Sequence, residues 1–360
     1  MARRDIVVIG GSSGGLEAVR TILSGFPGDL SAAIFVVLHS SPDSPGVLDR
    51  IFGRASVLRV TYAIDREPIE PGRVYLAPPD RHLLLKRDHV RVTRGPRENR
   101  FRPAVDPLFR TAASAHGGRV IGVVVSGGQD DGAVGLRLIK NHGGTAIVQD
   151  PLEAVAPGMP QAAVTHVEVD YVVKVDEIAG VIGRLAKEPI DVMEMAMKDE
   201  DMRDIAEMGS DAIHHAQNLG PPSPFTCPEC GGALWQSHED ELLQFQCHIG
   251  HRYSGESLVT AQSEALDHAL WAGLRALEEN AELRRRMARH ARDRGMAAIA
   301  AGYDEHAAES EQRAADIRRV LMPEGPDTAE ELPVAAGPKI QGEMPRKGGS
   351  EEFAPARRRD

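Results

Sequence analysis

The stretch DIVVIGGSSGGLEAVR, residues 5–20, constrains the fold more than any other part of the sequence. Residues 6–9 form an apolar, β-branched run of the kind that builds a strand buried on both faces. Glycines and serines at 10–15 end this run, and the apolar spacing of a helix begins at Leu16 and Val19. A strand, a glycine turn and a helix make the first half of a βαβ unit. Such a turn directs backbone N–H groups and the positive end of a helix at one point in space.

Two functions compete for this glycine turn. It could bind a phosphate, or it could present a serine nucleophile beside N–H groups that stabilise an oxyanion. A dinucleotide-binding turn needs the spacing G-x-G-x-x-G, but Ser12 occupies the middle of these positions. It also needs an acidic residue at the end of the second strand, whereas the second predicted strand, residues 32–38, is followed by His39. Both departures favour the nucleophile.

Strand-like and helix-like runs alternate from residue 3 to about residue 188, which predicts an α/β fold with a doubly wound, mostly parallel sheet. Three short strands, 73–76, 83–86 and 90–93, lie close together along the chain, and we expect them to form an antiparallel insertion at one edge of this sheet. The other predicted strands are 6–9, 32–38, 120–125, 145–149 and 171–175, and the predicted helices are 16–24, 45–52, 105–115, 132–141, 161–164 and 177–185.

The composition divides the chain into five predicted segments. Residues 1–188 hold the α/β domain, and acidic residues, methionines and a proline-rich end mark 189–224 as a linker. Residues 225–254, which bear cysteines and histidines, are expected to form a small zinc-ribbon-like module. Apolar residues at three- and four-residue steps predict an antiparallel helical pair over 255–322. Pro, Gly, Glu and Arg dominate 323–360, which predicts a disordered tail.

Charge and hydropathy exclude several classes of protein. The net charge of -11 argues against nucleic acid or an anionic membrane as a partner. No apolar run reaches the roughly 18 residues of a transmembrane helix, and the apolar run after the N-terminal arginines is too short for a signal peptide. We therefore expect a cytoplasmic protein without direct membrane insertion. Its three cysteines, all within 227–247, cannot form a fully paired disulfide framework.

Polar residues follow three of the predicted strands. Ser12 follows the first and His39 the second, while Asp130 and Asp131 lie in the loop after 120–125. Because ligands bind beyond the carboxyl ends of parallel strands, these side chains are expected at one rim of the sheet. A serine, a histidine and an aspartate are what an acyl-transfer triad requires, and either aspartate could serve, although each could also be a helix N-cap.

Six segments of the sequence match a known pattern: IGGSSGGL (9–16), VLHSS (37–41), YLAPPDRHL (75–83), PAVDPLFRTAA (103–113), VSGGQDDGA (125–133) and QDPLEAVAPGMPQ (149–161). Through them the sequence resembles the catalytic domain of the chemotaxis protein-glutamate methylesterase (CheB) family, and the resemblance spans residues 6 to about 185. The resemblance implies Ser12 as nucleophile, His39 as general base and Asp131 as the orienting acid, with N–H groups of Ser13 and of the 126–129 loop facing the oxyanion.

The resemblance also implies a reaction and a partner. A serine carboxylic-ester hydrolase of this family removes γ-methyl esters from glutamyl residues of methyl-accepting chemotaxis receptors, needs no cofactor, and can deamidate receptor glutamine by the same acyl chemistry. The family typically has methionine where Gly128 stands, so we expect a less firmly held oxyanion donor there. It also typically carries a receiver domain, which this sequence lacks, so we expect a different form of regulation.

The cysteines predict a metal site. The motifs Cys227-Pro-Glu-Cys230 and Cys247-His-Ile-Gly-His251 are separated by sixteen residues, a spacing typical of structural zinc. The expected ligands are Cys227, Cys230, Cys247 and His251, with His248 as the substitute for His251. A redox C-x-x-C is the alternative, but no thioredoxin-like βαβ context surrounds it.

Two other functions remain open. The chain could be a signalling adaptor that keeps the esterase fold for binding, with the zinc-type module and the helical pair as its working parts. A nucleotide-binding protein ranks third, because Ser12 stands where a dinucleotide-binding turn needs its middle glycine. We expect the C-terminal helices to support docking or self-association.

Overall fold

The computed structural model describes residues 2–190, 221–239 and 242–322. The predicted tail and most of the predicted linker lie outside these residues. The chain divides into two compact units, residues 1–269 and 270–360, with the boundary inside a long helix. The first unit holds the α/β domain and the cysteine module. No helix of the described ranges is both long and apolar enough to cross a bilayer.

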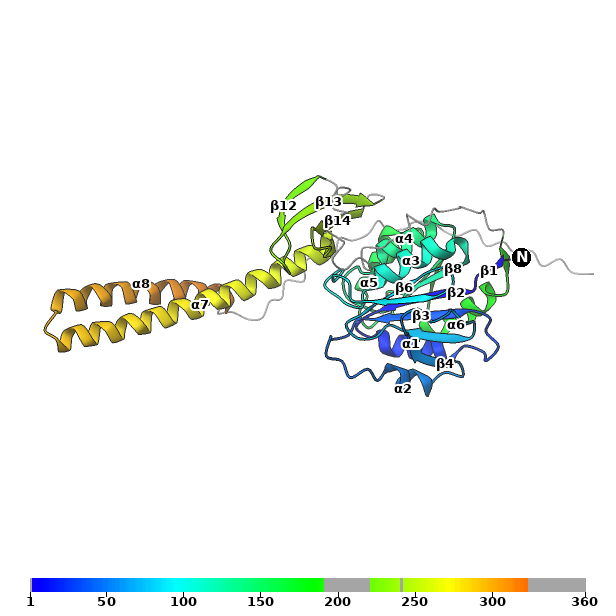
Figure 1. Ribbon diagram of the computed structural model, residues 1–360, viewed down its shortest axis with the longest axis horizontal. Helices are drawn as coiled ribbons and strands as arrows, with labels where there is room; N and C mark the ends of the chain where they lie inside the picture. Colours follow the sequence, from blue (N-terminus) through cyan, green and yellow to red (C-terminus); the bar gives the residue numbers. More distant parts are fainter. Residues whose placement is uncertain (1, 191–220, 240–241, 323–360) are drawn as a thin grey trace, which may run out of the picture. The chain divides into compact units, whose positions relative to one another are not determined.

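Seven parallel strands form the main sheet of the first unit (Figure 1), in the order β10-β9-β8-β2-β3-β5-β4. The central strands are buried along their whole length, as the apolar run at residues 6–9 predicts. The prediction of a doubly wound, mostly parallel sheet is therefore confirmed. The strands are β2 (Ile6–Gly11), β3 (Ala33–Leu38), β4 (Arg59–Tyr62), β5 (Arg73–Leu76), β8 (Val120–Val124), β9 (Thr145–Gln149) and β10 (Tyr171–Val173).

Helices cover both faces of this sheet (Figure 1). Side chains alternate between the faces along β2, so Val7 and Ile9 join one apolar cluster and Ile6 and Val8 join the other. The first cluster lies under α1 (Gly15–Ser24), α2 (Leu48–Gly53) and α6 (Val175–Leu185). The second lies under α3 (Val105–His116), α4 (Ala133–Asn141) and α5 (Gly158–His166), and the 3-10 helix Gly117–Arg119 follows α3.

The predicted antiparallel edge insertion needs a correction. Strands β6 (His82–Leu85) and β7 (Val90–Thr93) do pair antiparallel, but as a separate two-stranded sheet. Strand β5, expected in the same insertion, lies inside the parallel sheet between β3 and β4. All four of its residues are buried, as a central strand requires, and its closeness to β6 in sequence was misleading. Strands β4, β1 (Ala2–Arg3) and β11 (Pro189–Ile190) were not predicted, and β1 pairs with β11.

The cysteine module is a four-stranded antiparallel sheet. Its small core joins Cys227 and Cys247 to Leu234, Phe245 and Tyr253. The long helix α7 (Gly255–Asp293) begins directly after the last strand. The strands are β12 (Pro222–Thr226), β13 (Ala233–Glu239), β14 (Leu242–Cys247) and β15 (Arg252–Ser254).

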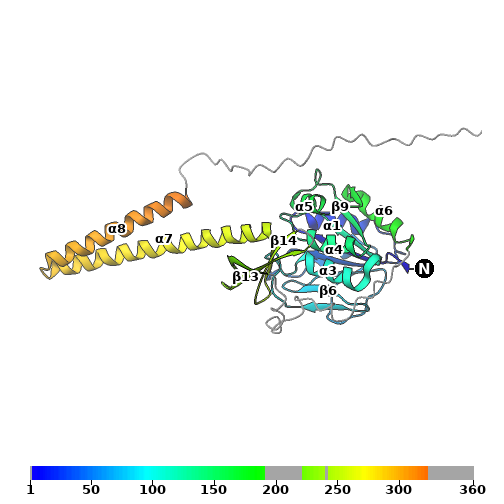
Figure 2. The ribbon, with the colours of Figure 1, turned by 90° about the horizontal axis from the view of Figure 1, so that it is seen from above.

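The second unit is a helical hairpin. Its two helices are the C-terminal part of α7 and the whole of α8 (Ala297–Leu321), and they run antiparallel (Figure 2). Gly295, with φ 73°, lies in the turn between them. Small side chains let the helices approach closely, and Arg285 makes ion pairs to Asp304 and Glu311 across the pair. The predicted helical pair is confirmed. The buried alanines of this unit include Ala281, Ala288, Ala300, Ala307 and Ala314, with steps of seven residues within each helix.

Candidate active site

Three predicted site residues lie at the carboxyl edge of neighbouring strands. Ser12 follows β2, His39 follows β3 and Asp131 lies in the loop after β8. Strand β2 lies between β3 and β8, and from it the strand order proceeds in opposite directions, which makes this edge a topological switch point. Backbone bonds continue past the strand ends, because Ser12 N–H donates to Ser126 O at 2.9 Å and His39 N–H to Gly11 O at 3.2 Å.

The turn at Ser12 leaves little room around the serine. Gly14 caps the start of α1 with φ 76°, a left-handed conformation that glycine adopts without strain. A Cβ at Gly127 would lie 2.9 Å from Ser12 Cβ and 2.1 Å from Met159 Sδ. Only glycine at this position therefore lets the loop after β8 pack against the turn that carries Ser12. Ser12 is partly buried and lines a pocket, whereas Ser13 is exposed. The fold thus presents Ser12, and not Ser13, to the pocket.

His39 is held between a carboxylate and an aromatic ring. Its Nε2 lies 2.7 Å from Asp131 Oδ2, and the two side chains are 3 % and 2 % exposed. The Phe101 ring stacks on the imidazole, with centroids 3.7 Å apart. Within the described residues, His39 Nδ1 is buried and has no hydrogen-bond partner. With the proton on Nε2 facing Asp131, the lone pair of Nδ1 is free to accept a proton.

The carboxylate of Asp131 lies against the N-terminus of α3. Its carboxylate accepts N–H bonds from Val105 at 2.7 Å and Asp106 at 3.2 Å, and a further bond from the side chain of Asn99 at 2.9 Å. Burial acts to raise the pKa of Asp131, but the hydrogen bond and positive charge of His39 and these other donors outweigh it and lower the pKa. Asp131 is therefore ionised at neutral pH.

The pKa values of the two neighbouring aspartates, Asp106 and Asp130, are raised instead. Burial and the nearby Asp131 charge raise the pKa of Asp106 well above its usual range. Within the described residues, His39 has its hydrogen bond with Asp131 and not with Asp130. Asp130 accepts a hydrogen bond from Ser254 at 2.7 Å, and burial raises its pKa to about 6. Asp131 is thus the aspartate that meets His39.

The pocket at Ser12 is open to solvent and has a volume of about 330 Å³. Two N–H groups of the 126–129 loop are already used, because Ser126 donates to Gln149 and Gly127 to Ala156. Within the described residues, the N–H groups of Gly128 and Gln129 have no such partner, so they remain candidates for the oxyanion donor that the family resemblance implies for this loop. The pocket is lined by Ser12, His39, Ser40, Ser41, Pro42, Arg97, Arg100, Phe101 and Arg102.

Three residues of this site were not predicted from the sequence. Asp106 lies in the PAVDPLF segment that carried the family resemblance, so it could have been noticed. Asn99 and Phe101 lie in a loop without periodicity, and no spacing signals that they reach Asp131 and His39.

The cysteine motifs also come together. Cys227, Cys230, Cys247 and His251 place one ligand atom each within 4.8 Å of one another, while His248 lies outside this group. The Cys230 and Cys247 sulfurs are 3.7 Å apart, and His251 Nδ1 is 3.4 Å from Cys247 Sγ. A tetrahedron with Zn–S bonds of about 2.3 Å separates its sulfurs by about 3.8 Å, so this cluster could hold a metal of that size. His251 Nε2 is 3.2 Å from Glu229, the outer carboxylate that metal-binding histidines usually have.

Comparison with known proteins gives consistent matches for the first half of the chain. The family model described as CheB methylesterase matches residues 7–182. A Leptospira interrogans protein, provisionally named a protein-glutamate methylesterase/protein-glutamine glutaminase, is 40% identical over 182 residues, which are 50% of this chain and 94% of that protein.

Two further matches cover the same region. Protein-glutamate methylesterase/protein-glutamine glutaminase 2 of Anaeromyxobacter dehalogenans is 40% identical over 186 residues, 52% of this chain and 54% of that protein. The crystal structure of the Thermotoga maritima CheB methylesterase catalytic domain is 34% identical, with a TM-score of 0.49, and the match covers 50% of this chain and 98% of that one. The cysteine module and the helical hairpin lie outside the residues that the family model matches.

Proposed function

Because the chain belongs to the CheB methylesterase family, we propose that it is a protein-glutamate methylesterase acting on chemoreceptors, with Ser12, His39 and Asp131 as a catalytic triad. The observation that carries the triad is the 2.7 Å hydrogen bond between His39 and Asp131, beside a pocket that Ser12 also lines. The names of the relatives support the substrate, a glutamyl γ-methyl ester on a protein.

The first half of the reaction forms an acyl-enzyme. Ser12 Oγ attacks the ester carbonyl while His39 Nδ1, the nitrogen that Asp131 leaves open, takes the serine proton. The carbonyl oxygen becomes an oxyanion, which accepts hydrogen bonds from the N–H groups of Ser13 and of Gly128 or Gln129. The protonated His39 then gives its proton to the departing methoxide, and methanol leaves. Asp131 stabilises the imidazolium and holds the ring in the productive tautomer.

The second half returns the enzyme to its starting state. Water attacks the acyl carbon, His39 takes one proton from it, and the C–O bond to Ser12 breaks. The proton on His39 returns to Ser12 Oγ, and the product is a glutamate side chain. No metal or cofactor takes part in these steps.

Methanol release from methylated receptor tests this function. The full-length Ser12→Ala protein should lose methanol release by a factor of about 10⁴ or more, because the nucleophile is gone. Ser13→Ala is the matched control, since it keeps the backbone N–H and should retain release within about threefold. Release by Ser12→Ala at the wild-type rate would refute Ser12 as nucleophile.

A second activity is favoured by the relatives, whose names include protein-glutamine glutaminase. The same acyl-enzyme forms from a receptor glutamine when ammonia leaves in place of methanol. Mass spectrometry of unmethylated receptor should then find conversion of glutamine to glutamate that depends on Ser12.

The metal of the cysteine module is proposed to be zinc, held by Cys227, Cys230, Cys247 and His251. Four protein ligands leave no open coordination position, so the ion supplies folding energy to the module and no catalysis. The five-segment division of the chain, and docking or self-association through the helices of 255–322, remain predictions.

A further inference from the structure

We propose that the end of the cysteine module and the first turn of α7 are a positioning part of the active site, and that Ser257 acts through Asn99 on Asp131. The inference rests on the proposed function only for the role of Asp131 in the triad. The module and α7 lie outside residues 7–182, so the family model does not describe this arrangement.

The Asn99 side chain joins the two parts. Its Nδ2 donates to Asp131 Oδ1 and to Asp106 Oδ2, both at 2.9 Å. Its Oδ1 accepts from Ser254 N–H and from Ser257 Oγ, both at 3.0 Å. The amide has only one orientation that fits, because the reverse one would place its oxygen against two carboxyl groups. The module therefore fixes the direction in which Asn99 donates to Asp131.

The hydrogen bond between Ser257 and Asn99 is buried. Ser257 is 0 % exposed and Asn99 is 4 % exposed, so water cannot replace a lost partner easily. Ser254 Oγ accepts from Ser257 N–H at 3.0 Å at the start of α7, and lies 2.7 Å from Asp130. The end of β15 and the first turn of α7 thus form one network with the loop that carries Asp131.

The backbone of the Asn99 loop is held by the same strand. Asn99 N–H donates to Arg252 O at 2.8 Å, and Arg252 N–H donates to Arg97 O at 3.3 Å. Asn99 and Arg100 have φ values of 48° and 74°, a left-handed conformation that costs free energy at a non-glycine residue such as Arg100. Pairing with β15 offsets this cost, so the loop depends on the module for its conformation.

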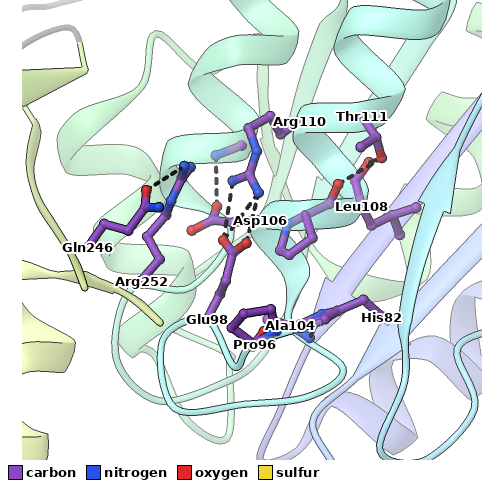
Figure 3. A network of polar contacts seen from close by, with 12 residues as sticks. His82, Pro96, Glu98, Ala104, Asp106, Leu108, Arg110, Thr111, Gln246 and Arg252 are labelled. Atoms are coloured by element: carbon purple, nitrogen blue, oxygen red, sulfur yellow. Dashed lines mark hydrogen bonds and ion pairs between the residues drawn. The ribbon is translucent and has the colours of Figure 1, made fainter. Parts of the chain in front are cut away.

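Glu98 anchors the same loop to the α/β domain (Figure 3). Its buried carboxylate pairs with Arg110 of α3, with 2.9 Å between Oε1 and Nη2, and its backbone forms a β-bridge with Arg252. Two residues beyond Asn99, Phe101 stacks on His39. One short loop therefore touches both the base and the acid of the triad, and the module holds its outer side.

Ser257→Ala in the full-length protein tests this coupling. The first measurement is the rate at which a fluorophosphonate labels Ser12, followed by intact mass, because this probe needs no receptor. The second is kcat and KM for methanol release. We expect labelling and kcat to fall by about tenfold, since a misdirected Asp131 no longer orients His39, with KM changed less than about twofold.

Ser263→Ala is the matched control. Ser263 lies on the same helix, and within the described residues its hydroxyl donates to the backbone carbonyl of Val259 alone, so both rates should stay within about 1.5-fold of wild type. Thermal melting of each variant checks folding. If Ser257→Ala does not melt cooperatively, Ser254→Ala takes its place, with an expected loss of about threefold because it removes the partner of the Ser257 N–H.

The outcomes are distinct. Wild-type labelling of a folded Ser257→Ala protein overturns the proposal, as does a defect confined to KM for receptor, which would make the module a docking element. If the wild-type protein is labelled at Ser12 but releases no methanol, the proposed function fails, and the labelling rates still decide whether the module positions the triad.

Discussion

Phe101 lies flat against His39, with the two rings 9° from parallel and their centroids 3.7 Å apart. Because the imidazole has a hydrogen-bond partner at only one nitrogen in the described structure, the aromatic ring is the other contact that fixes its plane. The orientation of the base therefore depends on a residue from a loop remote in sequence.

Phe101→Ala should lower kcat for methanol release by about tenfold, because an imidazole without this support samples unproductive orientations. KM should change less than about twofold if the ring supports the base alone. Phe101→Tyr keeps the flat ring and should stay within about threefold of wild type. Equal losses in the two variants would show that volume or polarity, and not ring stacking, matters at this position.

Asp131→Asn and Asp130→Asn form a matched pair at adjacent positions. The Asp131→Asn protein presents an amide to His39 and favours the wrong tautomer, so its kcat should fall by about 10⁴-fold. The Asp130→Asn protein keeps a side-chain oxygen that can accept the Ser254 hydroxyl, so its loss should be less than about tenfold. Both rates come from the methanol assay, and the reverse ranking would transfer the orienting role to Asp130.

His116 provides a pH-dependent contribution to stability. It is 7 % exposed, and burial followed by the nearby Arg119 lowers its pKa from 6.5 to about 4. A lowered pKa means that the unfolded chain binds the proton first as pH falls. The stability that the folded state gains from holding His116 neutral is thus fully present above pH 6.5 and is lost as the pH falls toward 4.

Urea unfolding of wild type and His116→Gln measures this contribution. The glutamine amide can donate to Lys86 O as His116 Nε2 does, but it cannot titrate. The difference in unfolding free energy between the two proteins should change by about 2.5 kcal/mol between about pH 8 and pH 4.5, with wild type losing more. His166→Gln, at an exposed position of α5, should match wild type at every pH. A pH-independent difference for His116→Gln would mean that the buried imidazole does not titrate as described.

Much of the α/β domain could be predicted from the sequence, because buried parallel strands are continuous apolar runs and glycine turns mark their ends. The strand at 73–76 was found but assigned to the wrong sheet, since a four-residue run carries no information about its partner. Strand β4 was missed because its residues, RVTY, are only partly buried and alternate weakly.

The site residues could be predicted where a reactive side chain comes directly after a strand, as Ser12 and His39 do. The contacts of Asn99 with Ser254 and Ser257 join residues more than 150 positions apart, and no local pattern encodes them. The choice between Asp130 and Asp131 needed the family resemblance, because both follow the same strand.

The metal site gives a prediction that separates two neighbouring histidines. His251 lies in the group of four ligand atoms and contacts Glu229 through its other nitrogen, whereas His248 is exposed and outside the group. Elemental analysis of the purified full-length protein should find about one zinc per chain. His251→Gln should lose most of this zinc, because three thiolates alone leave the coordination incomplete, and His248→Gln should keep it. A folded wild-type module without zinc would refute the metal site, and zinc loss confined to His248→Gln would exchange the roles of the two histidines.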